Sequence, residues 1–533
     1  MIFQGPPGKN LAALFFLASI KSMQSVVIVG GGTAGWLTAG VIAARHQARI
    51  QAGLFSVTLV ESPNVPIIGV GEGTWPTMRT TLEKMGVTET EFFRHCDAAF
   101  KQGARFAKWT HDSPEDGYYH PLMLPQAFTQ INLAPHWLGT RNERTFSDYV
   151  CPQGQLCDQG LAPKMITTPE YQAVANYAYH LDAGKFAPFL QKHCTGKLGV
   201  RHVLADVSRV TQTEQGDIKS VITQQAGEIE GDLFVDCTGF GALLLGKTLG
   251  VGFKDCTDVL FCDTALAIQI PYDTPDAPMA SHTISTGQSA GWIWDIGLPT
   301  RRGIGHVYSS RHCSEEAAYE TLRRYIGPAH RDRSIRKIKF RGGHREIFWK
   351  NNCVAVGLAA GFLEPLESSA IVLVELSAKL IAEQMPANRE VMDIVAARFN
   401  DVSAYRWGRI IDFLKLHYVL TQRTDSKFWL DNVDPVTVPD RLKNLLRLWK
   451  YQSPWFFDEF DRLEEVFPAA SYQYVLYGMG FRTEVTPEDN AATQARASRL
   501  VNENAAMTRK MLAQLPKNRD LLRKIYDYGL QPI

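Results

Sequence analysis

Residues 25–36, SVVIVGGGTAGW, join a β-branched strand to a glycine-rich turn, and the alanine-rich segment LTAGVIAARHQ continues as a predicted helix. The spacing Gly30-x-Gly32-x-x-Gly35 permits a tight turn, close approach of the backbone to a pyrophosphate and close packing of the helix. The N-terminus of that helix then faces the phosphates. This motif alone is weak evidence, because a structural glycine turn has the same appearance.

A second predicted strand with an acidic end follows at the spacing that a dinucleotide-binding unit requires. FSVTLVES reaches Glu61, 26 residues after Gly35, where a carboxylate can bind ribose hydroxyls. Strand, turn, helix, strand and acid therefore occur in the order of a dinucleotide-binding βαβ unit. The residues predicted to contact the cofactor are Gly30, Gly32, Thr33, Ala34, Gly35, Glu61 and Ser62.

Two later segments have the pattern of strands that return to the same sheet. DLFVDCTGF (232–240) and CVAVGLAAGF (353–362), the latter including Leu358 as a predicted cofactor contact, are apolar runs ending in small-residue turns. Such strand ends form the ligand crevice of a doubly wound sheet. A chain that returns to the crevice at several strand ends can contact FAD along its length, because FAD is elongated. This pattern predicts an α/β, Rossmann-like, flavin monooxygenase-like domain. No second GxGxxG follows, so we expect a separate flavin reductase to supply the electrons.

Composition excludes several classes of partner. Lys and Arg number 56 against 55 for Asp and Glu, so neither a nucleic-acid surface nor a polybasic membrane patch is indicated. Nine cysteines without a C-x-x-C pair predict reduced thiols in a cytoplasmic protein, with no disulfide framework and no metal site. We expect a small-molecule ligand.

The N-terminal segment 1–22 differs from the rest of the chain. Its ten-residue apolar run LAALFFLASI is too short to span a bilayer as a helix. The run resembles the hydrophobic part of a signal peptide, but no clean cleavage site separates it from the first strand. We interpret residues 1–22 as a disordered leader or extension, with Met23 as the natural start.

GFLEPLESSA (361–370) places two carboxylates, Glu364 and Glu367, three positions apart in an apolar stretch. EPLESSAIVLVELSAKLIAEQMP is predicted to be a helix, so both acids would lie in its first turn, and compensation of the helix dipole would explain them. Residues 23–390 are assigned to the FAD domain. From about 391 to 533 the periodicity is helical and predicts a substrate-covering region.

Several motifs occur in the order seen in flavin-dependent tryptophan halogenases, which this chain resembles. They are GGGTAGW, IGVGEGTWPT (68–77), AAFKQGARFAKW (98–109), VDCTGF, GWIWDIGLP (291–299) and GFLEPLES. The resemblance covers residues 25 to about 370, with weaker similarity beyond. It implies that reduced FAD and oxygen convert chloride or bromide to hypohalous acid, which reaches an essential lysine beside an aromatic substrate.

The resemblance assigns roles to particular residues. Lys101 is the essential lysine and Glu367 the catalytic glutamate, while Glu364 is a structural neighbour. Main-chain groups at Ser369 and Ala370, where the family usually has Thr-Gly, would bind the halide, as amides at a helix N-terminus can. IGVGEGTWPT resembles the strap that links the flavin and halide sites in the family, and Glu72 within it would bond the isoalloxazine or the strap backbone. Without the resemblance, Lys101 would be interpreted as a surface lysine.

Substrate identity is less specified by the sequence. YYHPLML retains His120, which flanks the indole in the family, but has Leu122 at the position of an aromatic residue. Tryptophan is therefore a plausible substrate, and another indole or a phenol stays open. The family is usually homodimeric. Two alternative functions compete: an FAD-dependent aromatic hydroxylase and a non-catalytic flavin- or indole-binding protein. Ring position and halide preference are not specified.

Overall fold

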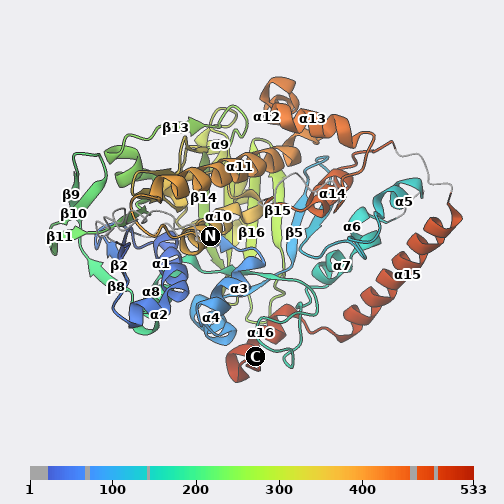
Figure 1. Ribbon diagram of the computed structural model, residues 1–533. Helices are drawn as coiled ribbons and strands as arrows, with labels where there is room; N and C mark the ends of the chain where they lie inside the picture. Colours follow the sequence, from blue (N-terminus) through green and yellow to red (C-terminus); the bar gives the residue numbers. More distant parts are fainter. Residues whose placement is uncertain (1–21, 67–71, 141–143, 457–464, 485–489, 533) are drawn as a thin grey trace, which may run out of the picture.

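The computed structural model describes residues 22–66, 72–140, 144–456, 465–484 and 490–532, so all but the last residue of the predicted leader lie outside the described part (Figure 1). It has an α/β fold with a helical C-terminal region, as the sequence predicts. All nine cysteines carry free thiols. No helix within these ranges has the length and apolar character that crossing a bilayer requires.

The first layer is a six-stranded sheet with the strand order β20-β21-β12-β1-β2-β8. β1 (Ser25–Val29) lies between β2 (Ser56–Glu61) and β12 (Leu233–Asp236), and both pairings are parallel. The outer strands are β8 (Arg201–Leu204), β21 (Cys353–Ala355) and the antiparallel β20 (Trp349–Lys350). The predicted return of residues 232–240 and 353–362 to the sheet of the first strand is therefore confirmed.

Helices cover the first sheet. α1 (Thr33–Arg45) starts directly after the glycine turn and packs between α8 (Ala183–Lys197) and α10 (Ser369–Glu383). β1 is buried along almost its whole length, as expected for a parallel strand covered on both faces. In Figure 1 this layer forms one end of the molecule.

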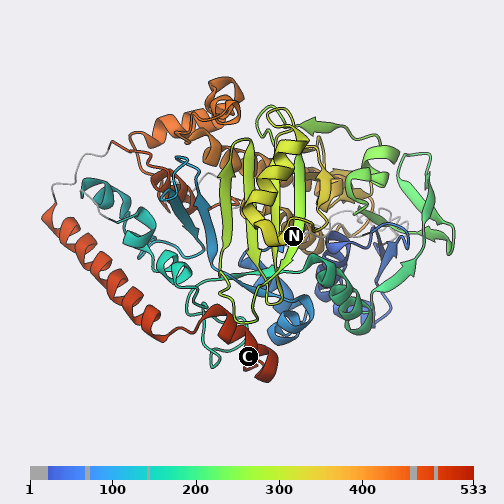
Figure 2. The same ribbon diagram turned by 180° about the vertical axis from the view of Figure 1, so that it is seen from behind.

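A second, mostly antiparallel sheet of seven strands lies beside the first. Its order is β18 (Arg336–Lys339), β14 (Thr264–Pro271), β17 (Arg301–Tyr308), β16 (Gly291–Gly297), β15 (Thr283–Gln288), β5 (Gly103–Ala107) and β6 (Gly117–Pro121). Only the β15–β5 pairing is parallel. α9 (Glu315–Ile326) lies against one face of this sheet in Figure 2. Its residues Ala318 and Leu322 belong to a buried cluster with side chains of the sheet. The opposite face is left for the site described below.

Three small sheets complete the β structure of the described residues. One consists of β3 (Glu72–Gly73), β7 (Ala178–Leu181) and β4 (Ala99–Lys101). The others are β9 (Val207–Gln212), β10 (Ile218–Thr223) and β11 (Gly227–Glu230), and β13 (Phe253–Asp255), β19 (Gly343–Arg345) and β22 (Gly361–Phe362). Short helices α2 (Gln47–Gln51), α3 (Thr77–Lys84), α4 (Glu89–Cys96), α5 (Ala134–Gly139), α6 (Phe146–Val150) and α7 (Gln153–Asp158) connect these layers.

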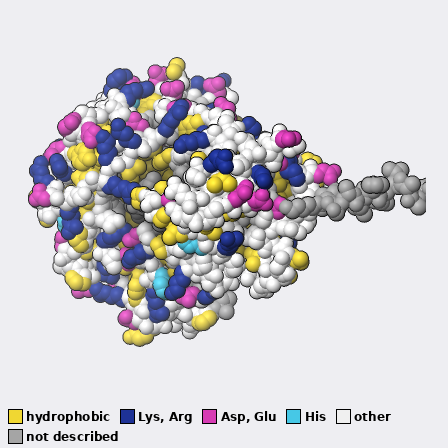
Figure 3. Space-filling model, turned by 90° about the vertical axis from the view of Figure 1, so that its left-hand side faces the viewer, with side chains coloured by type: hydrophobic (Ala, Val, Ile, Leu, Met, Phe, Trp, Pro, Cys, Tyr) yellow, Lys and Arg dark blue, Asp and Glu magenta, His cyan; other side chains and the backbone are white. Residues whose placement is uncertain are grey.

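The C-terminal region is helical, as predicted. It consists of α11 (Met392–Val419), α12 (Lys427–Val433), α13 (Asp440–Trp449), α14 (Ala469–Gly478), α15 (Ala491–Gln514) and α16 (Asn518–Tyr528). α14 packs on β6, and α15 packs on α6 and α7 at the end opposite to the first sheet (Figure 1). On the face in Figure 3, basic and acidic side chains are interspersed, in line with the balanced charge.

Candidate active site

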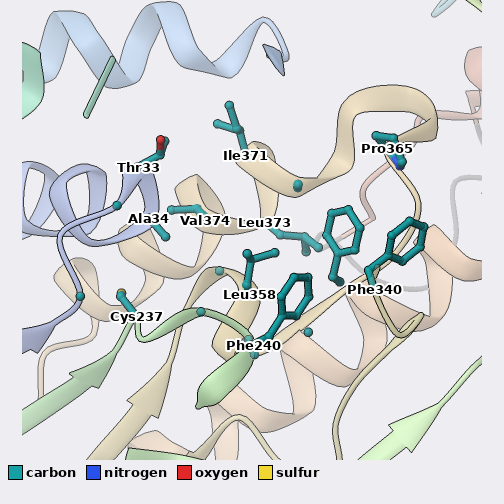
Figure 4. A pocket seen from close by; sticks show the side chains of 18 of the residues that line it. Thr33, Ala34, Cys237, Phe240, Phe340, Leu358, Pro365, Ile371, Leu373 and Val374 are labelled. Atoms are coloured by element: carbon teal, nitrogen blue, oxygen red, sulfur yellow. The ribbon is translucent and has the colours of Figure 1, made fainter. Parts of the chain in front are cut away.

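A cavity of about 520 Å³ extends from the glycine turn after β1 to the end of β4. It lies against the N-terminal half of α10 and one face of the seven-stranded sheet. The predicted site residues that line it are Gly30, Gly32, Thr33, Ala34, Glu61, Ser62, Lys101, Leu358, Glu367, Ser369 and Ala370. Figure 4 shows Thr33, Ala34, Leu358 and Ile371 around one part of this cavity.

The start of α1 is open to an anion. Gly32 is the residue before the helix, no side chain caps it, and the first turn contains no acid. A Cβ built on Gly32 would meet no heavy atom within 4 Å, whereas one on Gly35 would lie 1.8 Å from the Gly30 carbonyl oxygen. Gly32 therefore leaves room for phosphates at the positive end of the helix, and Gly35 permits close packing of helix on turn.

The acid at the end of β2 borders the same turn. A Cβ on Gly31 would lie 2.1 Å from the carboxyl carbon of Glu61, so a larger residue there would force the Glu61 side chain to move. Glu61 accepts a hydrogen bond from Trp36 Nε1 at 3.3 Å, and His202 Nε2 lies 2.9 Å from the same oxygen. Turn, helix end and acid form a cradle whose donors and acceptor suit an adenine dinucleotide such as FAD. The side chain of Glu72, another predicted contact, lies outside the described part.

One face of the seven-stranded sheet forms a wall of the cavity. Side chains that alternate along β15 and β16 point to it, as the period of a strand requires. They are Thr283 and Ser285 on β15, and Trp292, Trp294 and Ile296 on β16. Trp292 and Trp294 are two residues apart on β16 and therefore point to the same face.

Lys101 ends β4 and is only 3% exposed. Its Nζ donates to Ser368 Oγ at 3.0 Å and to the Thr74 carbonyl oxygen at 3.2 Å. Burial lowers the pKa of Lys101 to about 8, although the nearby charge of Glu367 raises it in part. The surface-lysine interpretation is therefore wrong, and the amine can exist in both protonation states near neutral pH.

Neither carboxylate lies in the first turn of α10, so compensation of the dipole of that helix is wrong as the explanation of either. α10 begins at Ser369, and before it Glu367 (φ 61°) and Ser368 (φ 57°) adopt left-handed backbone conformations. Such conformations are costly for residues other than glycine and persist only where the surroundings impose them. Here Trp75 Nε1 donates to the Glu367 carbonyl oxygen at 2.8 Å, which supports the turn.

The Glu367 side chain lies between two histidines. His120 Nδ1 is 2.8 Å from Glu367 Oε1, and His417 Nε2 is 3.2 Å from the same oxygen but is not aligned for a standard hydrogen bond. Burial alone would raise the pKa of Glu367, but His120 and His417 outweigh it and hold the pKa below its usual range. Glu367 is therefore a carboxylate at neutral pH, able to accept a proton only when a stronger acid forms beside it.

Each histidine is oriented by a hydroxyl on its far side. Tyr118 OH is 2.6 Å from His417 Nδ1, and Ser471 Oγ is 2.9 Å from His120 Nε2. A hydroxyl that donates to the nearer ring nitrogen leaves the other ring nitrogen to carry its N–H on the side of Glu367. Sequence reasoning missed His417, Tyr118 and Ser471, because a histidine or hydroxyl inside a helix or strand gives no local signal of its partner.

The structure brings Lys101, Glu367 and His120 together, but not Leu122. Neither His120 nor Leu122 lines the cavity, but His120 contacts the cavity residue Glu367, at 2.8 Å. The Leu122 backbone N–H donates to Gln153 Oε1 at 2.8 Å, and its carbonyl accepts from Asn176 Nδ2 at 2.7 Å. These bonds fix the backbone beside His120.

Comparison with known proteins gives matches along nearly the whole chain. A family model described as tryptophan halogenase matches residues 25–495. The chain is 35% identical over 481 residues to the tryptophan 6-halogenase SttH of Streptomyces toxytricini, covering 86% of this chain and 90% of that protein. It is 31% identical over 536 residues to the tryptophan 7-halogenase RebH of Lentzea aerocolonigenes, covering 94% and 98%.

A solved structure shares a higher sequence identity with this chain than these two relatives do. The crystal structure of a tryptophan halogenase from Shewanella frigidimarina NCIMB 400 matches with a TM-score of 0.94 and 47% sequence identity, over 96% of this chain and 99% of that one. The two curated relatives are named for different positions of the indole ring, 6 and 7.

Proposed function

Because the chain belongs to the family of flavin-dependent tryptophan halogenases, we propose that it halogenates tryptophan or a related indole through Lys101 and Glu367. One observation carries the proposal: a single cavity is lined both by the glycine turn that suits FAD and by these two side chains. Reduced FAD, when bound in that cradle, would supply hypohalous acid from oxygen and chloride or bromide. Gly30, Gly32, Thr33, Ala34, Glu61, Ser62 and Leu358 would hold it.

Lys101 is suited to control the oxidant. Hypohalous acid is a weak electrophile until it is activated, and a buried ammonium can donate a hydrogen bond to its oxygen, while a buried amine can take up its halogen. The depressed pKa of Lys101 makes both forms available near pH 8. Either route ends with the oxygen leaving as water.

Glu367 is suited to the second half of the reaction. As the carbon–halogen bond forms, positive charge develops in the ring, and the buried carboxylate stabilises it. Glu367 then accepts the proton that leaves the same carbon, which restores the aromatic ring. His120 and His417 hold the carboxylate in its charged form until that step.

The amides at the start of α10 support a halide site. The first N–H groups of a helix lack partners within it and attract anions, whatever the side chains. Ser369 and Ala370 begin α10 beside the cavity. The departure from the usual Thr-Gly is therefore compatible with halide binding.

A single incubation tests the proposal. The protein is mixed with FAD, a separate flavin reductase, NADH, chloride or bromide, and a panel of indoles and phenols, and the products are identified by mass spectrometry. We expect a halide-dependent, singly halogenated indole. Oxygenated product without halide would instead indicate an aromatic hydroxylase, and binding without turnover would indicate a flavin- or indole-binding protein.

A further inference from the structure

The buried carboxylate of Glu364 connects its loop to β16 and α11. Trp292 Nε1, on β16, donates to Glu364 Oε2 at 3.0 Å, and the hydroxyl of Tyr418, on α11, donates to the same oxygen at 2.7 Å. Glu364 is 2% exposed and Trp292 is 1% exposed. Because both donors are buried, each would lose a partner that water cannot replace if the carboxylate were removed.

The same turn of α11 contacts both carboxylates of the 364–367 loop. Tyr418 bonds to Glu364, and the preceding His417 lies beside Glu367. A displacement of Glu364 would therefore be transmitted along two adjacent residues to the network around Glu367.

The neighbouring Trp294 provides a contrast. Both tryptophans line the cavity, but within the described ranges Trp294 Nε1 has no hydrogen-bond partner. Its ring instead packs over Gly305, where a Cβ would lie 2.0 Å from it. Only Trp292 is oriented by a polar anchor.

Resting on the proposed function, we propose that Glu364 is a positioning residue for oxidant transfer. The bond from Trp292 Nε1 to Glu364 holds the Trp292 ring rigidly in the wall of the cavity along which the oxidant reaches Lys101. The bond from Tyr418 to Glu364 keeps α11 in position beside Glu367. Loss of this anchor should let oxidant escape from the cavity without lowering its formation.

Three variants separate the anchor from simple packing. Glu364→Leu removes the acceptor, and Trp292→Phe removes the donor and retains a ring. Glu364→Gln keeps an oxygen that can accept from both donors. Since Glu364→Leu also leaves Tyr418 and the buried Lys415 without their acidic neighbour, it can fold poorly, and Trp292→Phe then carries the test.

The readout is the partition of oxidant in a single turnover with reduced FAD, bromide and tryptophan, with a scavenger trapping free hypobromite. We expect the ratio of brominated product to trapped oxidant to fall roughly fivefold in Glu364→Leu and Trp292→Phe, the scale of one lost hydrogen bond. Glu364→Gln should stay within about twofold, and the double variant Glu364→Leu/Trp292→Phe should be no worse than Glu364→Leu alone. An unchanged ratio in folded Glu364→Leu or Trp292→Phe overturns the inference.

A second readout needs no turnover. With ¹⁵N-labelled tryptophan, the indole N–H signal missing in Trp292→Phe identifies Trp292. We expect slow hydrogen exchange of this N–H in wild type, Glu364→Gln and Tyr418→Phe, and fast exchange in Glu364→Leu. Fast exchange in wild type overturns the anchor.

A wild-type protein that forms no halide-dependent oxidant refutes the proposed function, whereas normal oxidant with an unchanged partition refutes only the role of Glu364.

Discussion

Lys101 Nζ lies 3.0 Å from the hydroxyl oxygen of Ser368, the residue directly after Glu367. Glu367 and Ser368 form a left-handed turn, so the turn that presents the carboxylate also anchors the amine. We propose that Lys101 acts at the start of the reaction, on the oxidant, and Glu367 at its end, on the ring proton. The same turn thus fixes the positions of both groups. A displacement of this turn should disturb both.

Gly73 offers a direct way to disturb the turn. A Cβ at this position would lie 2.6 Å from Ser368 Oγ and 3.1 Å from Lys101 Nζ. We expect Gly73→Ala to lower kcat at least tenfold by displacing Lys101, because small misplacements of reacting groups are costly. Gly196→Ala, at a helical position with open space around it, should leave activity unchanged. Equal activity of the two variants would contradict the arrangement.

Removal of the Lys101 charge should stabilise the fold at neutral pH. The folded pKa of about 8 lies below the ordinary value of 10.5, so below pH 8 the native state carries the full cost of a buried ammonium. We expect Lys101→Met to raise the free energy of unfolding at pH 7 by roughly 1–3 kcal/mol, part of the cost being offset by the lost bonds to Ser368 and Thr74.

The sign of the pH dependence follows from the same shift. Between pH 8 and 10.5 the unfolded chain binds more protons at Lys101 than the native one, so wild-type stability rises with pH in this window. The advantage of Lys101→Met should therefore shrink as pH rises through it. Denaturant unfolding at pH 7 and pH 10 measures this, and an advantage that grows with pH would contradict burial of a charged lysine.

His417 should affect the acidic limb of the pH profile. His417 and His120 hold the pKa of Glu367 below its usual range, so the wild-type carboxylate stays ionised from about pH 5 upward. His417→Phe removes one of these contributions and raises the pKa of Glu367. We expect kcat to fall as pH decreases toward 5 in this variant, and not in wild type.

A control separates this effect from loss of structure. His417→Phe leaves the Tyr118 hydroxyl without its partner, which costs about 1 kcal/mol or more of stability. His417→Phe/Tyr118→Phe removes that orphaned group as well. The fall of kcat toward pH 5 should be the same in both variants. If the double variant does not show this fall, the fall in His417→Phe is caused by unfolding.

Local patterns predicted the elements that carry their own signal. The run SVVIVGGGTAGW specified β1, its turn and α1, because glycine spacing and β-branched residues act locally. Trp292 and Trp294 point to the same face as their spacing requires, and the segment after 391 is helical. The resemblance pointed to Lys101, whose burial no local property indicates.

The contacts around Glu367 could not be predicted from local pattern. Neither glutamate nor serine favours a left-handed conformation, so the late start of α10 follows from tertiary contacts such as the bond from Trp75. His417 meets Glu367 across 50 residues of sequence, and a histidine on a buried helix face looks the same whether it bonds a carboxylate or a backbone group. Such partners are visible only when the chain is folded.

Separation of oxidant formation from oxidant use tests the central claim most directly. Wild type and Lys101→Met are given reduced FAD, oxygen, bromide and tryptophan, and both brominated product and scavenged hypobromite are measured. We predict that Lys101→Met loses product about 100-fold or more, while its total oxidant stays within about twofold of wild type. Lys108→Met, which changes a partly exposed lysine directly after β5, should behave as wild type. Undiminished bromination by Lys101→Met would contradict the account.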